Sequence, residues 1–459
     1  MDFSTIAAIS TPHGKGGVAV LRVSGSHALE IVSRIFEPFN TNAVFGNEPR
    51  KQIYGRLRSA DQQQELDDVL ATYFPAPHSF TGEDTVEIAC HGGEVITAMI
   101  LEALLSSGAV MAAPGEFSRR SFINGKMSLS SAEGIADLLD AKTEESAILS
   151  SKHSRGSLSA EIERISEAIL DCASSLWAFI DYPEDDLQEM SDIELSERLK
   201  GVIRLCDRLL ESFKIGRAVN SGVSAVIVGR PNVGKSTFFN CVLGEEKAIV
   251  TSQAGTTRDV LEYPVKMGKV LVNLADTAGV RNETTDVIEQ IGIDRALQYV
   301  SKAELVFAMF DGSEPFGSDD ARVVDYLLQQ KDVFIIPVVT KTDLPKVLDT
   351  GSIKVLGEAV YVSEKNPCLD TITRIVDEKY ISDEAALREG RILTNARQKA
   401  ALERAKSLLI EAEGQIMTHE KDVASLTLES ALSAVLEIDG REAGEKILDC
   451  VFSRFCVGK

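Results

Sequence analysis

Residues Gly229 to Thr237 have the composition and spacing of a phosphate-binding loop. They follow an apolar run, Val223–Val228, that predicts a buried strand, and they precede another, Phe238–Leu243, that predicts a helix. The glycines of the loop would let backbone N–H groups surround phosphate oxygens at the helix N-terminus. Lys235 would neutralise the β- and γ-phosphates, and Ser236 would offer a hydroxyl to Mg²⁺. The alternative is a glycine-rich turn, but the order strand, loop and helix favours a nucleotide site.

A second motif predicts which base the site reads. Thr340-Lys341-Thr342-Asp343 follows the apolar run Val333–Val339, which predicts a buried strand. Asp343 could accept hydrogen bonds from N1–H and the 2-amino group of guanine, while Lys341 would lie along the base. Adenine lacks those donors, so the motif selects GTP over ATP. Ser363 opens a weaker, supporting base loop in which Glu364 stands where a small residue is more usual.

Two further segments complete the pattern of a GTP site. A switch-like loop, Thr251 to Asp259, carries Thr257, which could complete Mg²⁺ coordination and sense the γ-phosphate. Asp276 ends a predicted strand and would reach Mg²⁺ through water, and the N–H of Gly279 could meet the γ-phosphate. Four motifs in this order predict a P-loop GTPase domain. The residues expected at the nucleotide are Asn232, Val233, Gly234, Lys235, Ser236, Thr237, Thr251, Ser252, Gln253, Ala254, Gly255, Thr256, Thr257, Asp276, Thr277, Ala278, Gly279, Thr340, Lys341, Asp343 and Ser363.

The catalytic group is not where many small GTPases carry it. Val280 follows Gly279 at the position of the glutamine that orients the attacking water, and valine cannot do this. Catalysis therefore needs another water-orienting group and another positive charge. Glu289 is a candidate for the first role, and the alternative is an exposed helix glutamate.

Bulk properties limit the class of protein. A chain of 459 residues predicts two to four domains. A net charge of −22 argues against a broad basic face for nucleic acid, so an RNA substrate would need a partner to hold it. No apolar run reaches membrane-helix length and the start resembles no signal peptide, which predicts a cytoplasmic protein. The seven cysteines form neither a metal-type pair nor a disulfide framework, and we expect most to be buried.

The element pattern predicts a multidomain fold. Strand and helix patterns alternate at first, helical patterns follow from about residue 120, an α/β block comes next, and helices then return. The α/β block is therefore expected to be inserted into one helical domain. The expected domains are 1–119 (α+β, N-terminal), 120–215 (all-α, first part), 216–382 (α/β, Ras-like P-loop GTPase) and 383–459 (all-α, second part).

Several motifs outside the α/β block resemble those of the MnmE (TrmE) family of tRNA-modification GTPases. They are Thr11 to Val18, Leu21 to Gly25, Phe80 to Asp84, Pro114 to Ser118, Asn124 to Lys126, and the terminal Cys456-Val457-Gly458-Lys459. The resemblance spans the chain. It implies a homodimer that works with an FAD-containing partner, MnmG (GidA), in a heterotetramer or larger complex, with tRNA held mainly by the partner. The family adds an aminomethyl or carboxymethylaminomethyl group at C5 of the wobble uridine, and 5-formyl- or methylene-tetrahydrofolate supplies the one-carbon unit.

The resemblance also implies roles for particular residues. The N-terminal domain would bind folate and dimerise, with folate contacts from Arg22, Glu87, Lys126 and Lys459. Two G domains would meet across the dimer with K⁺ in place of an arginine finger. The K⁺ ligands would be Asn232, Thr251, Gln253 and Thr256. Glu289 would orient the water, so the expected catalytic residues are Glu289, Lys235 and Asn232. Cys456 is either a nucleophile or redox group, or it helps to place the tail.

Two other functions stay open at this point. A regulatory or ribosome-assembly switch GTPase would need only the nucleotide site, but no second Walker loop or basic appendage accompanies it here. A folate-dependent enzyme that acts alone would need its own redox cofactor, and the sequence contains no flavin or nicotinamide motif.

Overall fold

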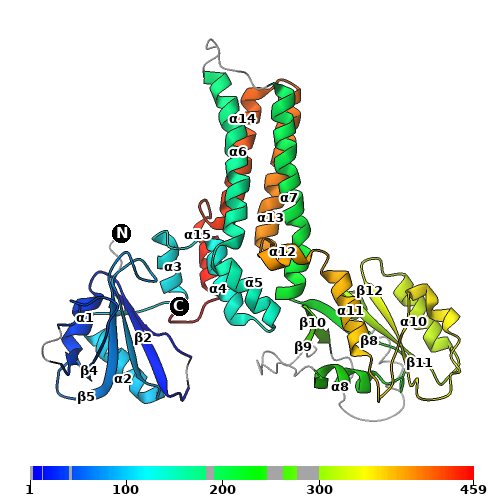
Figure 1. Ribbon diagram of the computed structural model, residues 1–459, viewed down its shortest axis with the longest axis horizontal. Coiled ribbons are helices and arrows are strands. Elements are labelled where there is room, and N and C mark those ends of the chain that lie inside the picture. The colour runs from blue at the N-terminus through cyan, green and yellow to red at the C-terminus, as the bar shows by residue number, and fades with distance from the viewer. Residues whose placement is uncertain (1–3, 13, 41–43, 182–190, 246–261, 276–298) are drawn as a thin grey trace. The chain divides into compact units, whose positions relative to one another are not determined.

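The computed structural model describes residues 4–12, 14–40, 44–181, 191–245, 262–275 and 299–459. The chain forms two compact units, both discontinuous in sequence (Figure 1). Unit 1 comprises Met1–Ala136, His153–Leu199 and Ser407–Lys459, and unit 2 comprises Asp137–Lys152 and Lys200–Lys406. The expected multidomain class, with an α+β N-terminal part, a large helical part and an α/β P-loop part, is confirmed.

The N-terminal part is built on a seven-stranded sheet with the order β3-β4-β5-β6-β2-β1-β7. All neighbours are antiparallel except β1 and β7, which are parallel. The strands are β1 Ile6–Ile9, β2 Val18–Ser24, β3 Phe36–Pro38, β4 Gln52–Arg58, β5 Glu65–Phe74, β6 Thr85–His91 and β7 Val110–Met111. Alternation along β6 buries Val86, Ile88 and Cys90 on one face, as a half-buried strand requires. Helices α1 (Ala28–Ile35) and α2 (Glu94–Ser106) pack together and cover this sheet (Figure 1).

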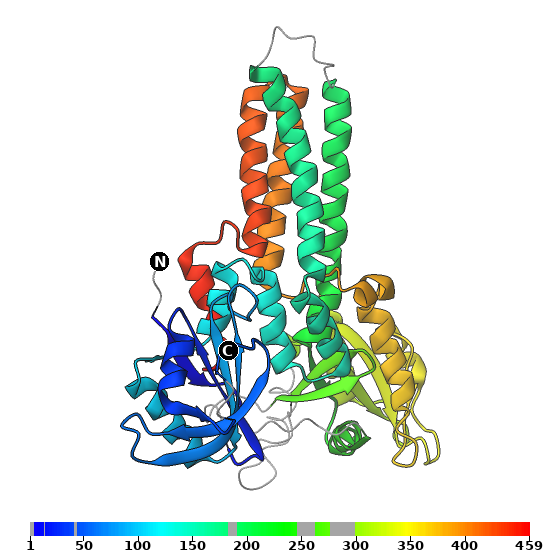
Figure 2. The ribbon, with the colours of Figure 1, turned by 60° about the vertical axis from the view of Figure 1, so that its left-hand side comes forward.

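Helices make up most of the remaining chain outside the α/β block. They are α3 Glu116–Ile123, α4 Leu129–Asp140, α5 Glu144–Ser154, α6 Ser157–Asp181, α7 Asp192–Asn220, α13 Ala396–Met417, α14 Lys421–Asp439 and α15 Glu445–Phe452. In unit 1, α6 and α14 lie side by side (Figures 1 and 2). On α6, residues spaced three and four apart form one buried apolar face, made of Ile162, Ile165, Ile169, Cys172 and Leu176. Each such aliphatic side chain contributes about 1.5–3 kcal/mol when fully buried.

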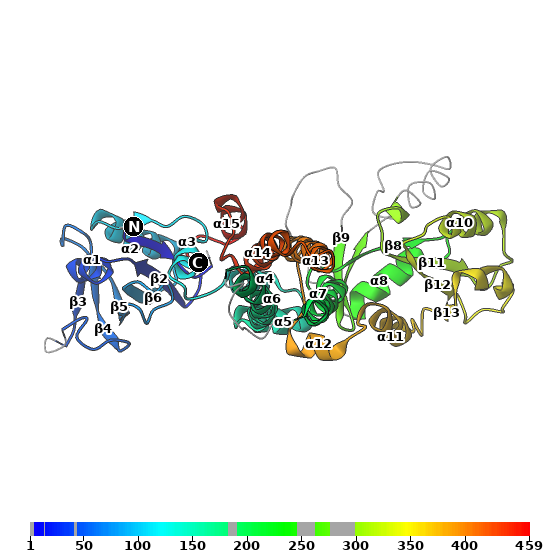
Figure 3. The same ribbon diagram turned by 90° about the horizontal axis from the view of Figure 1, so that it is seen from above.

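The α/β block of unit 2 is a six-stranded sheet with the order β13-β12-β11-β8-β10-β9, in which β9 alone is antiparallel to its neighbour among the described strands. Helices α8 and α11 pack on one face and α10 on the other (Figure 3). The strands are β8 Val223–Val228, β9 Glu262–Met267, β10 Val270–Ala275, β11 Leu305–Asp311, β12 Phe334–Thr340 and β13 Val360–Tyr361. The helices are α8 Lys235–Glu245, α10 Ser318–Leu328, the 3₁₀ helix η1 Thr350–Leu356, α11 Leu369–Tyr380 and α12 Glu384–Glu389.

The expectation that most cysteines are buried is wrong. Burial holds for Cys90, Cys172 and Cys206, whose thiol pKa it raises to about 11, 11 and 12. Cys450 and Cys456 are exposed because they lie on the short last helix and the tail. Across the described ranges, no helix is long and apolar enough to span a membrane.

A buried carboxyl in the helical part of unit 1 predicts a pH effect on stability. Asp439 ends α14 with 4% exposure, accepts hydrogen bonds from the hydroxyls of Ser130 and Ser159, and lies 3.8 Å from Arg441. Burial raises its pKa despite those hydroxyls. A carboxyl with a raised folded-state pKa holds its proton more tightly when folded, so stability falls as pH rises from the unfolded pKa through the folded one.

Asp439→Asn is therefore expected to reduce the loss of stability with rising pH. At pH 7 the melting temperature of the variant is expected to equal or exceed that of the unchanged chain. The amide oxygen of asparagine can still accept from Ser130, and it never ionises. Thermal melts from pH 4 to 7 measure this, with the exposed Asp171→Asn on α6 as the matched control. An unchanged pH slope in Asp439→Asn would contradict the assignment.

Candidate functional site

The carboxyl ends of five parallel strands bring the predicted nucleotide motifs to one edge of the unit 2 sheet. The loop after β8 is the phosphate-binding loop, β12 delivers Thr340, and Ser363 follows β13 by two residues. In the sheet, β8 lies between β10 and β11. The chain therefore continues from β8 to the strand on one side, β10, and then crosses to the strand on the other side, β11. Ligands of open α/β sheets bind at such a switch in strand order, so the loop after β8 lies where a nucleotide is expected.

Backbone geometry explains the loop sequence. Gly229 has φ +155°, and a Cβ there would lie 2.6 Å from the carbonyl oxygen of Met309. A side chain at this position would push the loop away from β11. Asn232 adopts the left-handed conformation with φ +59°, which asparagine tolerates better than most residues. Gly234, with φ +97°, then turns the chain into α8 so that the N-terminal N–H groups of this helix face the loop.

One threonine links the phosphate loop to the base motif. The hydroxyl of Thr340 lies 2.7 Å from the carbonyl oxygen of Val233 and 3.1 Å from that of Phe310. The Lys235 ammonium donates to the carbonyl oxygens of Gly229 and Arg230, at 2.9 and 2.8 Å. The Lys235 ammonium therefore lies over its own loop, where the phosphate oxygens of a bound nucleotide would also lie.

A pocket of about 260 Å³ joins this loop to the base motif. Its lining residues come from α8, from the end of β12 and from the loop after β13. They are Gly234, Thr237, Phe238, Cys241, Thr340, Lys341, Asp343, Leu344, Val362, Ser363, Glu364 and Pro367. The walls are largely apolar and carry two acidic residues, Asp343 and Glu364. A carboxylate at Asp343, next to the base motif, suits a planar base that carries two adjacent N–H donors. The arrangement can hold a guanine next to a phosphate-binding helix end.

Several predicted residues lie outside the described residues. They are Thr251, Ser252, Gln253, Ala254, Gly255, Thr256, Thr257, Asp276, Thr277, Ala278, Gly279 and Glu289. Their roles toward Mg²⁺, K⁺, the γ-phosphate and water stay predictions.

The N-terminal sheet brings together two of the residues expected at a folate. Arg22 on β2 and Glu87 on β6 are directly opposite, and the guanidinium donates two hydrogen bonds, of 3.0 and 2.8 Å, to one carboxylate oxygen. The guanidinium carbon also lies 5.0 Å from the ring centre of Phe80 and 5.6 Å from that of Phe117. Cation–π contact of this kind fixes the arginine head at the sheet surface. Charge, carboxylate and aromatic rings together suit a flat heterocycle with N–H donors.

The C-terminal tail contacts the same part of the sheet. The Ser10 hydroxyl donates to the Gly458 carbonyl oxygen at 3.0 Å. Gly458 has φ +101°, and a Cβ there would lie 2.1 Å from the Ile9 carbonyl oxygen, so glycine is required for this approach. Burial, and then the charge of Arg22, lower the pKa of Lys459. The structure thus places Lys459 in the electrostatic field of Arg22, while Lys126 is exposed and donates to the Pro77 carbonyl oxygen.

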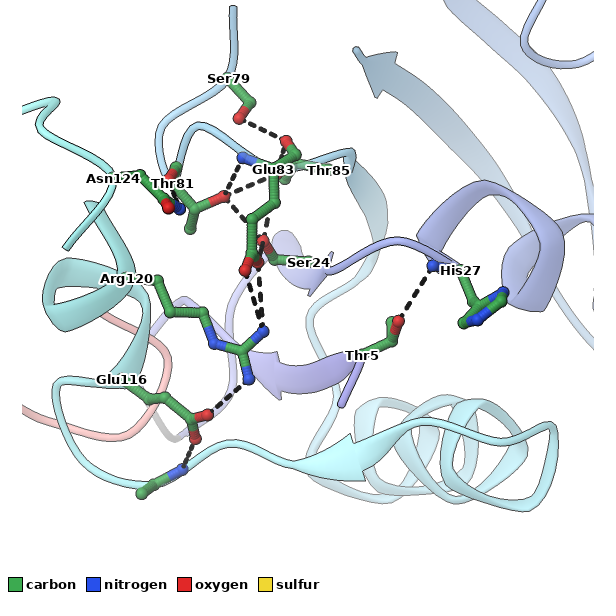
Figure 4. A network of polar contacts seen from close by, with 11 residues as sticks. Thr5, Ser24, His27, Ser79, Thr81, Glu83, Thr85, Glu116, Arg120 and Asn124 are labelled. Carbon is green, nitrogen blue, oxygen red and sulfur yellow. Dashed lines mark hydrogen bonds and ion pairs between the residues drawn. The ribbon is translucent and has the colours of Figure 1, made fainter. Parts of the chain in front are cut away.

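Arg120 holds the loop that carries Glu83 (Figure 4). Its guanidinium donates to both carboxylate oxygens of Glu83, at 3.3 and 3.1 Å, and to Glu116 at 2.7 Å. Ser24, two residues after Arg22, donates to the same Glu83 at 2.8 Å. Three motifs that are far apart in the sequence, Phe80 to Asp84, Pro114 to Ser118 and Asn124 to Lys126, therefore meet around one buried arginine.

Arg120→Met is expected to lower the free energy of unfolding of unit 1 by about 3 kcal/mol or more. The carboxylates of Glu83 and Glu116 are largely buried, and the substitution removes the positive charge that both of them pair with. Denaturant unfolding measures the change. Arg119→Met is the matched control, since Arg119 is the chain neighbour of Arg120 and pairs with the exposed Asp449. Equal, small effects of both substitutions would show that the Arg120 network does not hold the loop.

Sequence reasoning missed several residues of these sites. Phe80 and Phe117 lie inside motifs that indicated the family but not their contacts with Arg22. No sequence pattern marked Ser10 as a partner of the tail. Asp311 could have been found, because it is a carboxylate at the carboxyl end of a fully buried strand. Cys241 lines the base pocket from the second turn of α8.

Comparison with known proteins adds the family context. Residues 5–126 match the family described as "GTP-binding protein TrmE N-terminus", and residues 129–456 match "MnmE helical domain". A protein from Caldicellulosiruptor saccharolyticus named tRNA modification GTPase MnmE is 37% identical over 463 residues, which cover the whole of both chains. One of the same name from Thermoanaerobacter sp. is 35% identical over 467 residues, again with full coverage. A solved structure of Aquifex aeolicus Era with GDP.AlF4- has 25% identity and a TM-score of 0.26 and covers 40% of this chain and 66% of that chain.

Proposed function

This chain belongs to the MnmE family of tRNA modification GTPases, and from that premise we propose that it is a K⁺-activated, dimerising enzyme of wobble-uridine modification. It is a GTP hydrolase that acts in tRNA modification, as its family membership establishes. The observation that supports the GTP site most directly is the pocket in which Asp343 and the phosphate-binding loop meet through Thr340. With an FAD-containing partner, the chain would add an aminomethyl or carboxymethylaminomethyl group at C5 of the uridine.

The phosphate loop supplies what GTP hydrolysis needs from this chain. The N-terminus of α8 and the Lys235 ammonium would hold the β- and γ-phosphates, and the Ser236 hydroxyl, exposed at the first turn of α8, fits a magnesium ligand. When bound, Mg²⁺ would neutralise charge on the phosphate oxygens. Glu289 is proposed to orient the attacking water.

Potassium is proposed to supply the positive charge that an arginine finger gives in other GTPases. The arginine of the loop itself, Arg230, is engaged elsewhere, with Glu314 at 2.6 Å and with the buried Asp311 and Asp320, each at 3.7 Å. Asn232 is exposed on the same loop, and its amide oxygen fits a K⁺ ligand. Thr251, Gln253 and Thr256 would complete the site when two G domains meet, and their separation after hydrolysis would drive the modification step.

The N-terminal sheet is proposed to bind 5-formyl- or methylene-tetrahydrofolate, the source of the one-carbon unit. Glu87 would accept from pterin donors, Arg22 and Lys459 would bind the glutamate tail or orient the ring, and Lys126 would extend the cationic border. The FAD-containing partner MnmG (GidA) would supply the redox chemistry and most tRNA contacts, and the chain would act as a homodimer within that complex.

Arg22→Met is expected to weaken binding of 5-formyl-tetrahydrofolate by about tenfold or more, since it removes a charge-assisted contact. Isothermal calorimetry with the full chain measures this. Arg56→Met is a matched control, because Arg56 also pairs with a carboxylate, Asp68 at 2.8 Å, and lies 5.0 Å from the ring of Phe39. No binding heat with the unchanged chain, or equal loss in both variants, would remove the folate proposal.

A regulatory or ribosome-assembly switch GTPase is the second candidate. Such a protein would share the GTP pocket. It would need neither the Arg22–Glu87 pair of the N-terminal sheet nor the C-terminal tail that contacts it. Modification of a tRNA transcript by the chain and its FAD-containing partner separates the two functions, because a switch GTPase would leave the uridine unchanged.

A further inference from the structure

A buried carboxylate lies between the base motif and the phosphate loop. Asp311 is the last residue of β11 and is 3% exposed. One of its oxygens accepts from the backbone N–H and the hydroxyl of Ser313, at 2.9 and 2.6 Å. These two bonds fix the carboxylate plane, so its other oxygen points in a defined direction.

That second oxygen binds the lysine of the base motif. The Lys341 ammonium lies 2.6 Å from Asp311 Oδ2. Lys341 has φ +54°, an unfavourable backbone conformation for a lysine, which the surrounding contacts must hold in place. Although burial alone would raise the pKa of Asp311, the ion pair with Lys341 and the Ser313 hydrogen bonds hold it below its ordinary value. Asp311 is therefore ionised at neutral pH and available to orient the lysine along the pocket wall.

The same oxygen also lies near the phosphate loop. Arg230 Nη2 is 3.7 Å from Asp311 Oδ2, and the backbone carbonyl oxygen of Arg230 accepts from the Lys235 ammonium. The turn after Asp311 is tied to the base motif as well, because the Gly312 N–H donates to the Thr340 carbonyl oxygen at 2.9 Å. A Cβ on Gly312 would lie 2.8 Å from that oxygen, so a residue without a side chain is needed for this close approach.

We infer that Asp311 is a positioning residue that couples guanine recognition to the phosphate loop, by orienting Lys341 for the base and Arg230 within the loop. Asp311 itself touches neither base nor phosphate. The inference deepens the GTP-binding function and rests on it: loss of the Asp311 carboxylate loosens both ends of the nucleotide site together.

The test is a double-mutant cycle with Asp311→Asn and Lys341→Met, read by equilibrium binding of fluorescent GDP to the full chain in Mg²⁺. Each single variant is expected to weaken GDP by about tenfold, and the double variant by little more than either one, because both remove the same contact. Inosine diphosphate lacks the 2-amino group that Asp343 would read. Asp311→Asn is expected to weaken GDP and inosine diphosphate by the same factor, since Asp311 acts through Lys341 and the loop and not through the 2-amino contact.

Glu314→Gln is the matched control, because it removes the negative charge that lies 2.6 Å from Arg230 and leaves the Asp311–Lys341 pair intact. Its effect on GDP binding is expected to stay within about twofold. Additive losses in the cycle, or a change in melting temperature with unaltered GDP affinity, would overturn the inference. If Asp311→Asn does not fold, the cycle between Lys341→Met and Arg230→Met tests the same shared carboxylate, with coupling of about threefold or more expected and additivity overturning it. Failure of GDP to bind the unchanged chain would instead remove the GTP-binding function itself.

Discussion

Asp343→Asn is expected to weaken GDP binding by about a thousandfold and to shift the preference of the pocket toward xanthine nucleotides. Asp343 lines the base pocket with its carboxylate, which can accept from the two adjacent N–H donors of guanine. An asparagine presents one acceptor and one donor, so it leaves a guanine donor unmatched. Xanthine carries a carbonyl oxygen in place of the 2-amino group, and the asparagine N–H can donate to it. Competition of GDP and xanthosine diphosphate against a fluorescent nucleotide measures both changes.

Glu364→Gln is the matched control for Asp343→Asn, since Glu364 lines the same pocket and the substitution also removes one negative charge. Its GDP affinity is expected to change by no more than about threefold. A comparable loss in both variants would attribute the effect to local charge and would contradict a base-reading role for Asp343.

Lys235→Met is expected to lower kcat/KM for GTP by about a thousandfold. The ammonium lies at the N-terminus of α8, beside the loop carbonyl oxygens. There it can stabilise the negative charge that develops on the transferred phosphoryl group. Methionine keeps the aliphatic stem and removes the charge, so the loss reports electrostatic stabilisation and leaves packing nearly unchanged. Phosphate release at GTP concentrations well below KM measures kcat/KM directly.

Lys354→Met, on the exposed surface of η1, controls for the loss of one positive charge from the same domain. It is expected to turn over GTP at the unchanged rate. Residual turnover of Lys235→Met within about tenfold of the unchanged chain would contradict the assigned role of the loop lysine.

The two nucleotide motifs could be predicted because their chemistry is contiguous in sequence. A strand, a glycine-rich loop and a helix follow one another from Val223 to Leu243, and Asp343 lies three residues after the last residue of β12. The spacing of residues along the chain is therefore enough to predict how these two motifs are placed at the nucleotide. The helical face of α6 was predictable for the same reason, since a repeat of three and four residues is a local property.

Contacts between distant segments could not be predicted. Arg120 binds Glu83 across 37 positions, and Ser10 binds Gly458 across 448 positions, so no local pattern marks either pair. The position of Asp311 at the end of a buried strand was visible in the sequence, but its ion pairs with Lys341 and Arg230 join distant segments and were not. The burial of the cysteines could not be predicted, because it depends on where a helix or the tail lies, which composition does not encode.

We propose that this GTPase draws the positive charge for hydrolysis from K⁺ bound at Asn232, and GTP turnover in K⁺ and in Na⁺ at equal ionic strength tests this most directly. Strong activation by K⁺ is predicted for the unchanged chain and should disappear in Asn232→Ala. Asn232→Gly belongs beside it because φ at this position is +59°, which glycine adopts without strain, so equal loss in both variants assigns the effect to the amide. Equal turnover in the two salts, or K⁺ activation that survives both substitutions, would contradict the claim and favour the switch GTPase.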